Sequence, residues 1–238
     1  MSMPQKQDLV SFKDLQIQVT WKKVKYLRLT VSAPDGLIKI SAPINSNKQT
    51  IEDFVTAQLK WIKKHQSKYL SQPKQPIINF ESGEVHILFG RPYSLLVEEI
   101  LAKKNSYKQI EITDLHFKIV INSGSSIQQR EKLVYDYYRS EIKKIIPGLI
   151  AKWEPVIGKK VLQWNVKKMK TRWGSCNINA KRIWLNLELA KKPPECLEYV
   201  IVHEMVHLLE RYHNQRFYHF MDQFLPNWKL IRKQLNSN

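Results

Sequence analysis

The sequence contains few cysteines, no long apolar run and comparatively few acidic residues. Its 238 residues include only 2 cysteines, Cys176 and Cys196, which are too few for a disulfide framework and typical of a reducing compartment. No apolar run approaches the length of a membrane span, and residues 1–11 lack the apolar core of a secretion signal. We therefore expect a cytoplasmic protein with no membrane partner.

Basic residues clearly outnumber acidic ones. The chain has 39 Lys and Arg against 21 Asp and Glu, a formal net charge of +18, which favours association with polyanions. Nucleic acid is therefore a candidate partner. Lysine pairs such as Lys22-Lys23 and Lys191-Lys192 are spread along the chain and do not form one basic arm. An overall preference for lysine explains the charge equally well.

The most informative motif is the segment His203-Glu204-Met205-Val206-His207. In a helix, residues four apart lie on the same face, so His203 and His207 can present ring nitrogens to one metal ion. Glu204 then lies at the flank, where a carboxylate can act as a general base without being a metal ligand. The motif predicts two ligands and the base of a zinc-dependent hydrolase.

Residues outside the motif also predict this helix. Pro193, Pro194 and Glu195 are typical of a first helical turn, because proline is tolerated there and an acidic residue suits the helix dipole. Apolar residues on both sides of the motif supply a buried face. The alternative interpretation is a core helix in which the two histidines only form hydrogen bonds.

A catalytic zinc usually has three protein ligands, so a third donor is required. His213 is the best candidate, because it follows the motif closely and needs only local backbone geometry to reach the ion. Glu210, Asp222 and His219 are the alternatives, and Glu210 would give a set of two His and one Glu. The glutamate at position 210 also excludes the longer metzincin pattern, which has glycine there.

Further residues near the motif are candidates for supporting roles. Trp173 is expected to pack beneath the site and Gly174 to permit a tight turn, whereas Cys176 is more typical of a packed residue than of a ligand. Hydrogen bonds to the distal nitrogens of the ligating histidines are expected from Asn186 and Asp222. The candidates for stabilising an oxyanion are Arg172, Tyr212, Tyr218 and His219.

The first half of the chain is predicted to be mainly β-strand. Alternating apolar residues predict a hairpin over residues 26–41 within a small antiparallel sheet, and a helical stripe predicts one helix near residues 47–70. This helix is expected to end before Pro73 and Pro76. Further strands are predicted at residues 85–89, 93–97, 109–112 and 116–121.

The segment at residues 122–126 (NSGSS) is the clearest linker by composition, so a domain boundary is predicted there. Residues 1–122 would form a β-rich region, and residues 123–238 a mainly helical domain with a small β-sheet. The overall class is α+β. In the second part we expect a helix over residues 128–146 that ends at Pro147-Gly148, strands over residues 161–169 and 182–187, and helices over residues 216–224 and 228–235.

Ordered motifs extend well beyond the five-residue segment. They comprise residues 170–176 (KTRWGSC), 183–189 (IWLNLEL), 199–208 (YVIVHEMVHL), 213–217 (HNQRF) and 226–228 (PNW) and, in the first half, residues 28–31 (RLTV), 35–36 (DG), 41–43 (SAP), 61–62 (WI) and 88–91 (LFGR). In order and spacing they resemble the YgjP-like metallopeptidases, relatives of the SprT-like zincins. The resemblance covers most of the chain.

The resemblance implies a zinc ion held by His203, His207 and His213, with Glu204 as the catalytic base. It also implies that residues 123–238 form a zincin-like catalytic domain that hydrolyses a peptide or protein. In such a site an edge strand beside the cleft holds the substrate by main-chain pairing. None of the departures from the family pattern removes a ligand or the base; these are Phe89, Asn214-Gln215 and Tyr218.

Two other functions remain open at this stage. One is a non-catalytic nucleic-acid-binding protein with a structural zinc, but structural sites usually have a fourth protein ligand, often cysteine, and no cysteine pair lies nearby. The other is a peptidase that acts on DNA-associated protein, because SprT-like relatives are associated with protein attached to DNA. This second reading would explain both the basic charge and the motif.

Overall fold

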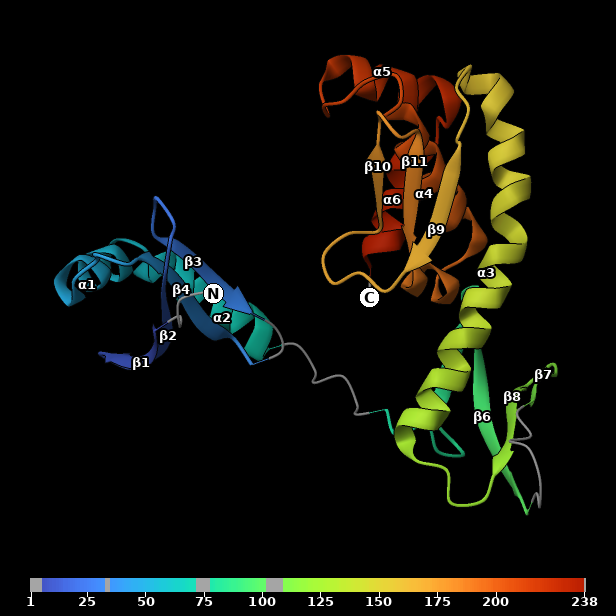
Figure 1. Ribbon diagram of the computed structural model, residues 1–238, viewed down its shortest axis with the longest axis horizontal. Helices are drawn as coiled ribbons and strands as arrows, with labels where there is room; N and C mark the ends of the chain where they lie inside the picture. Colours follow the sequence, from blue (N-terminus) through green and yellow to red (C-terminus); the bar gives the residue numbers. More distant parts are fainter. Residues whose placement is uncertain (1–5, 33–34, 72–77, 102–108, 238) are drawn as a thin grey trace. The chain divides into compact units, whose positions relative to one another are not determined.

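The computed structural model describes residues 6–32, 35–71, 78–101 and 109–237. The chain forms two compact units, which comprise residues 1–77 and 78–238 (Figure 1). Each unit combines helices with β-sheet, so the α+β class expected from the sequence is confirmed. None of the described helices combines the length and the apolarity needed to cross a membrane.

The first unit contains a four-stranded sheet with the strand order β1-β2-β4-β3. Two antiparallel hairpins form it, β1 with β2 and β3 with β4, and the second confirms the hairpin expected over residues 26–41, although its residues 33–34 lie outside the described chain. β2 and β4 pair in parallel, so the sheet is mixed and not antiparallel as predicted. The alternation of apolar and polar residues indicates each hairpin, but it does not indicate whether the two hairpins pair in parallel or antiparallel. The bounds are Lys6–Phe12 for β1, Leu15–Lys22 for β2, Arg28–Ser32 for β3 and Leu37–Pro43 for β4.

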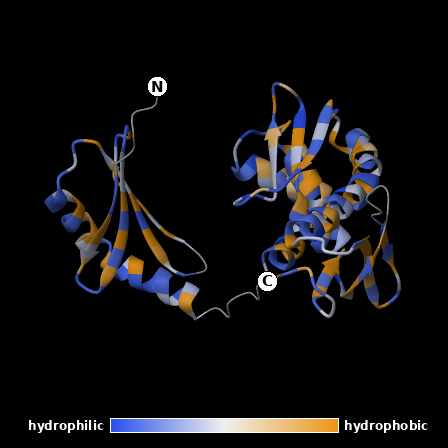
Figure 2. Cartoon of the chain, turned by 60° about the horizontal axis from the view of Figure 1, so that its bottom comes forward, coloured by the Kyte–Doolittle hydropathy of each residue, from blue (hydrophilic) through white to orange (hydrophobic). Residues whose placement is uncertain are grey.

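Two helices, α1 (Lys48–Ala57) and α2 (Leu59–Leu70), cover this sheet. Apolar and polar residues alternate along its strands (Figure 2), and the buried set on β2 and β4 packs against Ile51, Val55 and Ile62 of the helices. The single helix predicted here is interrupted at Gln58, where the backbone leaves helical geometry (φ −101°, ψ 5°). The expected break at Pro73 and Pro76 lies outside the described residues.

The second unit contains two small sheets and a set of helices that share one apolar core. The first sheet has the order β5-β6-β8-β7 and the second the order β10-β11-β9. The elements are β5 (Val85–Leu88), β6 (Arg91–Ile100), β7 (Gln109–Ile112), β8 (His116–Asn122), α3 (Ile127–Ile157), β9 (Gln163–Lys167), β10 (Gly174–Asn177), β11 (Arg182–Asn186), the 3-10 helix η1 (Leu187–Lys191), α4 (Pro194–Val206), α5 (Gln215–Phe224) and α6 (Trp228–Asn236).

Helix α3 is much longer than predicted, because it continues through Pro147 and Pro155. A proline inside a helix removes one backbone hydrogen bond and strains the preceding turn, at a cost of about 3 kcal/mol. A buried stripe that continues past Pro147 offsets this cost; it comprises Ile142, Ile146, Ile150, Trp153 and Ile157. Figure 1 shows the two halves of α3 beside the two sheets of the unit.

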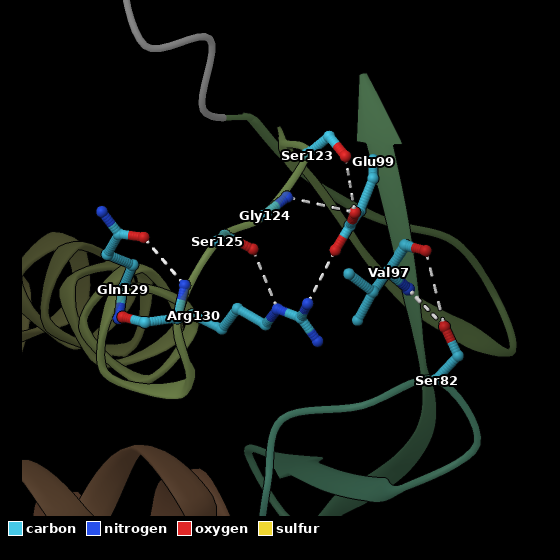
Figure 3. A network of polar contacts seen from close by, with 9 residues as sticks. Ser82, Val97, Glu99, Ser123, Gly124, Ser125, Gln129 and Arg130 are labelled. Atoms are coloured by element: carbon cyan, nitrogen blue, oxygen red, sulfur yellow. Dashed lines mark hydrogen bonds and ion pairs between the residues drawn. The ribbon is translucent and has the colours of Figure 1, made fainter. Parts of the chain in front are cut away.

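The predicted linker is an ordered turn between β8 and α3 (Figure 3). Glu99 of β6 accepts hydrogen bonds from the Ser123 hydroxyl (3.1 Å) and the Gly124 amide (3.4 Å), and it forms an ion pair with Arg130 (2.7 Å). Ser126 caps α3 in a reciprocal pair with Gln129. β5–β8 also share the core of α3, so the division at residues 77–78 differs from the boundary predicted at residues 122–123.

The second small sheet flanks the histidine-bearing helix. β9 and β11 are the two predicted strands and pair in parallel, whereas the connection between them contains an unpredicted strand, β10, which pairs antiparallel to β11. β10 pairs with β11 alone and so forms an edge of the sheet. α4 contacts both β10 and β11, as well as α3, α5 and α6. The motif helix therefore lies at the centre of this part of the unit.

Candidate metal centre

The motif residues lie on the last turn of α4 and in the loop that follows it. The helix begins with Pro193 at its N-cap, as predicted, and ends at His207, which is the C-cap. The chain then turns, and the Glu210 amide donates to the Val206 carbonyl (2.9 Å). Asn214 caps α5 by accepting a hydrogen bond from the Phe217 amide (3.0 Å). This turn and cap return the loop to the face of α4.

His203, His207 and His213 converge in space. One ring nitrogen from each lies within 4.8 Å of the others, and the Nε2 atoms of His203 and His213 are 3.0 Å apart. Three imidazole nitrogens at these separations suit one small divalent cation, because zinc binds imidazole at about 2.0–2.1 Å in tetrahedral geometry. The donor set therefore fits the metal that the sequence predicts.

Phe217 holds the three imidazoles together from beneath. Its ring centroid lies 4.9 Å from that of His203, 4.8 Å from that of His207 and 4.6 Å from that of His213, and its side chain is fully buried. Packing against one rigid ring restricts the rotation of all three. Nothing in the local sequence pattern indicates this role for Phe217.

The ring of His207 is oriented by a backbone hydrogen bond. Its Nδ1 lies 3.1 Å from the Glu210 carbonyl oxygen, and if Nδ1 carries the proton, Nε2 is left free for a metal. The Glu210 carboxylate accepts from the Tyr212 amide (3.2 Å). Asp222 accepts from the Trp228 indole (2.8 Å) and pairs with Lys229 (3.2 Å). Among the described residues the candidate metal-binding group contains neither acid.

The electrostatics of the site favour neutral imidazoles. Burial lowers the pKa of His203 to about 3, and the charges of His207, His213 and Arg232 add to the effect. Burial is also the main cause that lowers the pKa of His207 and of His213. A neutral ring nitrogen is the form that binds a metal, so no proton needs to be displaced near neutral pH.

Glu204 is buried beside the histidines and under β10. Burial raises the pKa of its carboxyl group to about 8, and the charge of Arg172 acts in the opposite direction. A cation held by the three rings would also favour the ionised carboxylate. A Cβ atom at Gly174 would come within 2.6 Å of Glu204 Oε1. Gly174 therefore allows close packing on the carboxylate, and this role replaces the tight turn predicted for it.

Two of the predicted supporting roles are wrong. Asn186 does not contact a ligating histidine: its side chain donates to the backbone carbonyls of Met169 (3.0 Å) and Arg172 (2.8 Å) and so fixes the segment before β10. Asp222 is bonded to Trp228 and Lys229, as described above. Trp173 lines the cleft, and its indole donates to Asn236 of α6 (3.2 Å).

The histidines open into a cleft of about 1080 Å³. Residues of β10, α4 and α6 line it, and of the four predicted oxyanion-stabilising residues only Arg172 belongs to the lining. Cys176 also lines the cleft, but it stands outside the metal-binding group, and burial raises the pKa of its thiol to about 12. Arg232 of α6 was missed by the sequence analysis. The feature that could have indicated Arg232 is its position one helical turn after Trp228, which belongs to the motif at residues 226–228.

Comparison with known proteins gives a family and distant structural likenesses. No curated protein matches the chain. A crystal structure of the metallopeptidase zymogen of Pyrococcus abyssi abylysin is similar at 18% identity and a TM-score of 0.36, over 38% of this chain and 90% of that chain. A likeness at this level carries no further conclusion.

The family match is extensive. The sequence profile of the YgjP-like family, metallopeptidase domain, matches residues 25–238, which include the histidines, Glu204, the second unit and the first unit from residue 25 onward. The chain belongs to the YgjP-like metallopeptidase family.

Proposed function

We propose that this protein is a zinc-dependent peptidase that uses Glu204 as its general base. The observation that carries the proposal is the convergence of three ring nitrogens within 4.8 Å, beside a buried carboxylate of the same helix, at the floor of an open cleft. Three imidazole donors with no acidic ligand favour zinc over magnesium or calcium, which prefer oxygen. His203, His207 and His213 would hold the ion.

The mechanism follows from the placement of the chain's own groups. A bound zinc ion supplies Lewis-acid chemistry, which activates water and polarises a scissile carbonyl. Glu204 accepts the proton of the attacking water and delivers it to the leaving amine nitrogen, so one carboxylate serves as base and then as acid. Its burial keeps bulk water away from this exchange. Arg172, which lines the cleft near Glu204, is the candidate for stabilising the developing oxyanion.

An extended peptide can be held by the edge of β10. In the strand order β10-β11-β9, β11 occupies one side of β10, and residues 174–177 also line the cleft. Main-chain hydrogen bonds to such an edge bind a peptide with little regard to its sequence. The substrate backbone would then run past Glu204, which lies against Gly174.

Metal analysis and hydrolysis of an unfolded protein, with and without chelator, test the proposal. Glu204→Gln is expected to retain one zinc per chain and to lose activity by about 10²–10⁴-fold, because only the proton transfer is removed. His203→Ala is expected to lose both metal and activity. His219→Ala is the matched control, because His219 is exposed on α5 and stands outside the metal-binding group. Full activity of Glu204→Gln would refute the assigned base.

A nucleic-acid-linked form of this function is the second candidate. The charges of Lys167 and Arg182 both lie over the Trp184 ring, on the three-stranded sheet. An aromatic ring beside basic groups suits nucleic acid, because bases stack on aromatic side chains and basic groups contact the phosphates. DNA affinity across a salt series tests it, because phosphate contacts release counterions in proportion to their number. A weak, salt-independent response in which Trp184→Ala has no effect would exclude this candidate.

A further inference from the structure

The lining of the cleft is strongly cationic. Three arginines line it, Arg172, Arg211 and Arg232, whereas Glu204 is the only carboxylate among the lining residues. The arginines are exposed, but Glu204 is 5% exposed, so the charge that a ligand meets is positive. A cleft lined by charge of one sign concentrates the field within it and attracts the opposite charge.

The three arginines come from separate elements around the metal centre. Arg172 precedes β10, Arg211 follows α4 in the turn toward His213, and Arg232 lies on α6. Arg232 lines the same cleft as His203 and His213, and its charge acts on both rings. A ligand at the metal centre therefore meets a cation on each of these sides.

Arg232 is held in place by an aromatic stack. Trp228, one turn earlier on α6, stacks on Tyr199 of α4 (centroids 6.4 Å apart) and on Tyr218 of α5 (5.6 Å). Its indole donates to Asp222 (2.8 Å). The guanidinium of Arg232 lies over the Trp228 ring, 6.0 Å from its centroid. The family motif at residues 226–228 thereby fixes the helix turn that carries Arg232.

Among the described residues no ion pair joins Arg211 or Arg232 to a carboxylate, and the charge of Arg172 acts on the buried Glu204. Two other arginines are bonded within the chain: Arg130 pairs with Glu99 (2.7 Å), and Arg139 donates to the Val166 carbonyl (2.5 Å). The N–H groups of the cleft arginines are therefore available to a ligand. A guanidinium presents its N–H groups in a planar fork that matches a carboxylate.

We propose that the cleft selects peptides that bear a carboxylate close to the scissile bond, with Arg232 as the residue that determines this specificity. The inference rests on the proposed peptidase function and names its substrate class. The carboxylate is that of an Asp or Glu side chain or of the peptide's carboxyl terminus. The three sources share one chemistry, and synthetic peptides separate them.

The test uses the zinc-loaded full-length protein and matched peptides. One pair differs only by Glu or Gln beside the scissile bond, a second substitutes Asp and Asn, and a third has a free or an amidated carboxyl terminus. Arg232→Gln is compared with Lys233→Gln, which removes one charge from the same helix outside the cleft lining. Circular dichroism verifies that both variants fold. Binding of the labelled peptides to Glu204→Gln protein provides a readout without turnover.

We expect the wild type and Lys233→Gln to favour the acidic peptide of at least one pair by roughly fivefold, since an exposed ion pair contributes up to about 1 kcal/mol. Arg232→Gln should lose this preference, measured as the ratio of kcat/KM for the acidic and the neutral peptide of each pair. Equal binding and equal rates for all pairs in the wild type would overturn the inference. Equal losses in both variants would assign the preference to overall charge and overturn the role of Arg232.

Two outcomes separate this inference from the function on which it rests. Acidic-peptide binding that depends on Arg232, without hydrolysis of any peptide, would support the cleft specificity and refute the peptidase function. A single-stranded oligonucleotide that displaces the acidic peptide, and binds more tightly with the same dependence on Arg232, would identify the cleft as a nucleic-acid site and overturn the inference.

Discussion

The packing of Gly174 on Glu204 yields the sharpest prediction for catalysis. In Gly174→Ala the new methyl group would lie 2.6 Å from Glu204 Oε1, 2.8 Å from its Cγ and 2.9 Å from Val200 Cγ1. Ordinary contacts begin at 3.4 Å, so the carboxylate must retreat by roughly 0.8 Å. Overpacking of this kind costs about 1–3 kcal/mol of stability. A displacement close to an ångström at a catalytic group costs about 100-fold in rate.

We therefore expect Gly174→Ala to bind zinc with unchanged stoichiometry and to lose about 100-fold in kcat. The candidate ligands are spared because the three nearest atoms to the added methyl group belong to Glu204 and Val200, so Glu204 is touched directly. Hydrolysis of a quenched fluorescent unfolded protein measures kcat, metal analysis counts zinc, and urea denaturation measures stability. Gly148→Ala is the control, because Gly148 is exposed in α3 with nothing within 4 Å of its added methyl group.

The control variant should be neutral or more stable by about 0.5–1 kcal/mol, since alanine is the better helix former. Its activity should equal that of the wild type. If Gly174→Ala retained full kcat with its zinc bound, Glu204 would not require its close contact with β10. The assignment of Gly174 as the residue that positions the base would then be wrong.

Two further predictions concern stability and metal affinity. Phe217→Ala removes the ring beneath the three histidines, so we expect a loss of about 3–5 kcal/mol in unfolding free energy and weaker zinc binding in competition with a chelating dye; unchanged affinity would contradict its role. Burial holds the pKa of His86 below 6.5 in the folded chain. As the pH falls, His86 is therefore protonated in the unfolded chain before it is protonated in the folded chain, and the free energy of unfolding should decrease below about pH 6.5. Urea denaturation between pH 7.5 and 5 should show a shallower fall in His86→Gln, and an identical slope would refute the assignment.

The sequence indicates the first two candidate metal ligands because the information for them is local. Helical periodicity alone places His203 and His207 on one face. The prolines at positions 193 and 194 predict the start of the helix. His213 required the family resemblance, since spacing left Glu210, Asp222 and His219 open. In the structure His213 lies with His203 and His207, whereas Asp222 is bonded to Trp228 and Glu210 to Tyr212.

The errors arose where distant residues override local signals. Pro147-Gly148 ends a helix by local rules, yet α3 continues because its buried stripe continues. The sequence of residues 122–126 resembles a flexible linker, but Glu99 and Arg130 fix it from two sides. In both cases the structure depends on contacts with residues that are distant in sequence. A short stretch of sequence does not contain these contacts.

The same reasoning explains why the motif indicates Glu204 as the candidate base but does not indicate the residues that surround it. The motif identifies the carboxylate, but the chemistry of this group depends on the space beside it. Gly174 leaves that space open. Gly174 belongs to β10, a strand that the sequence pattern did not predict. Arg232 likewise reaches the cleft only because Trp228 is held between α4 and α5. A family motif such as residues 226–228 can therefore act at a distance, by fixing the helix from which a charged side chain reaches the metal centre. Substituting Trp228 should consequently change substrate preference as well as stability.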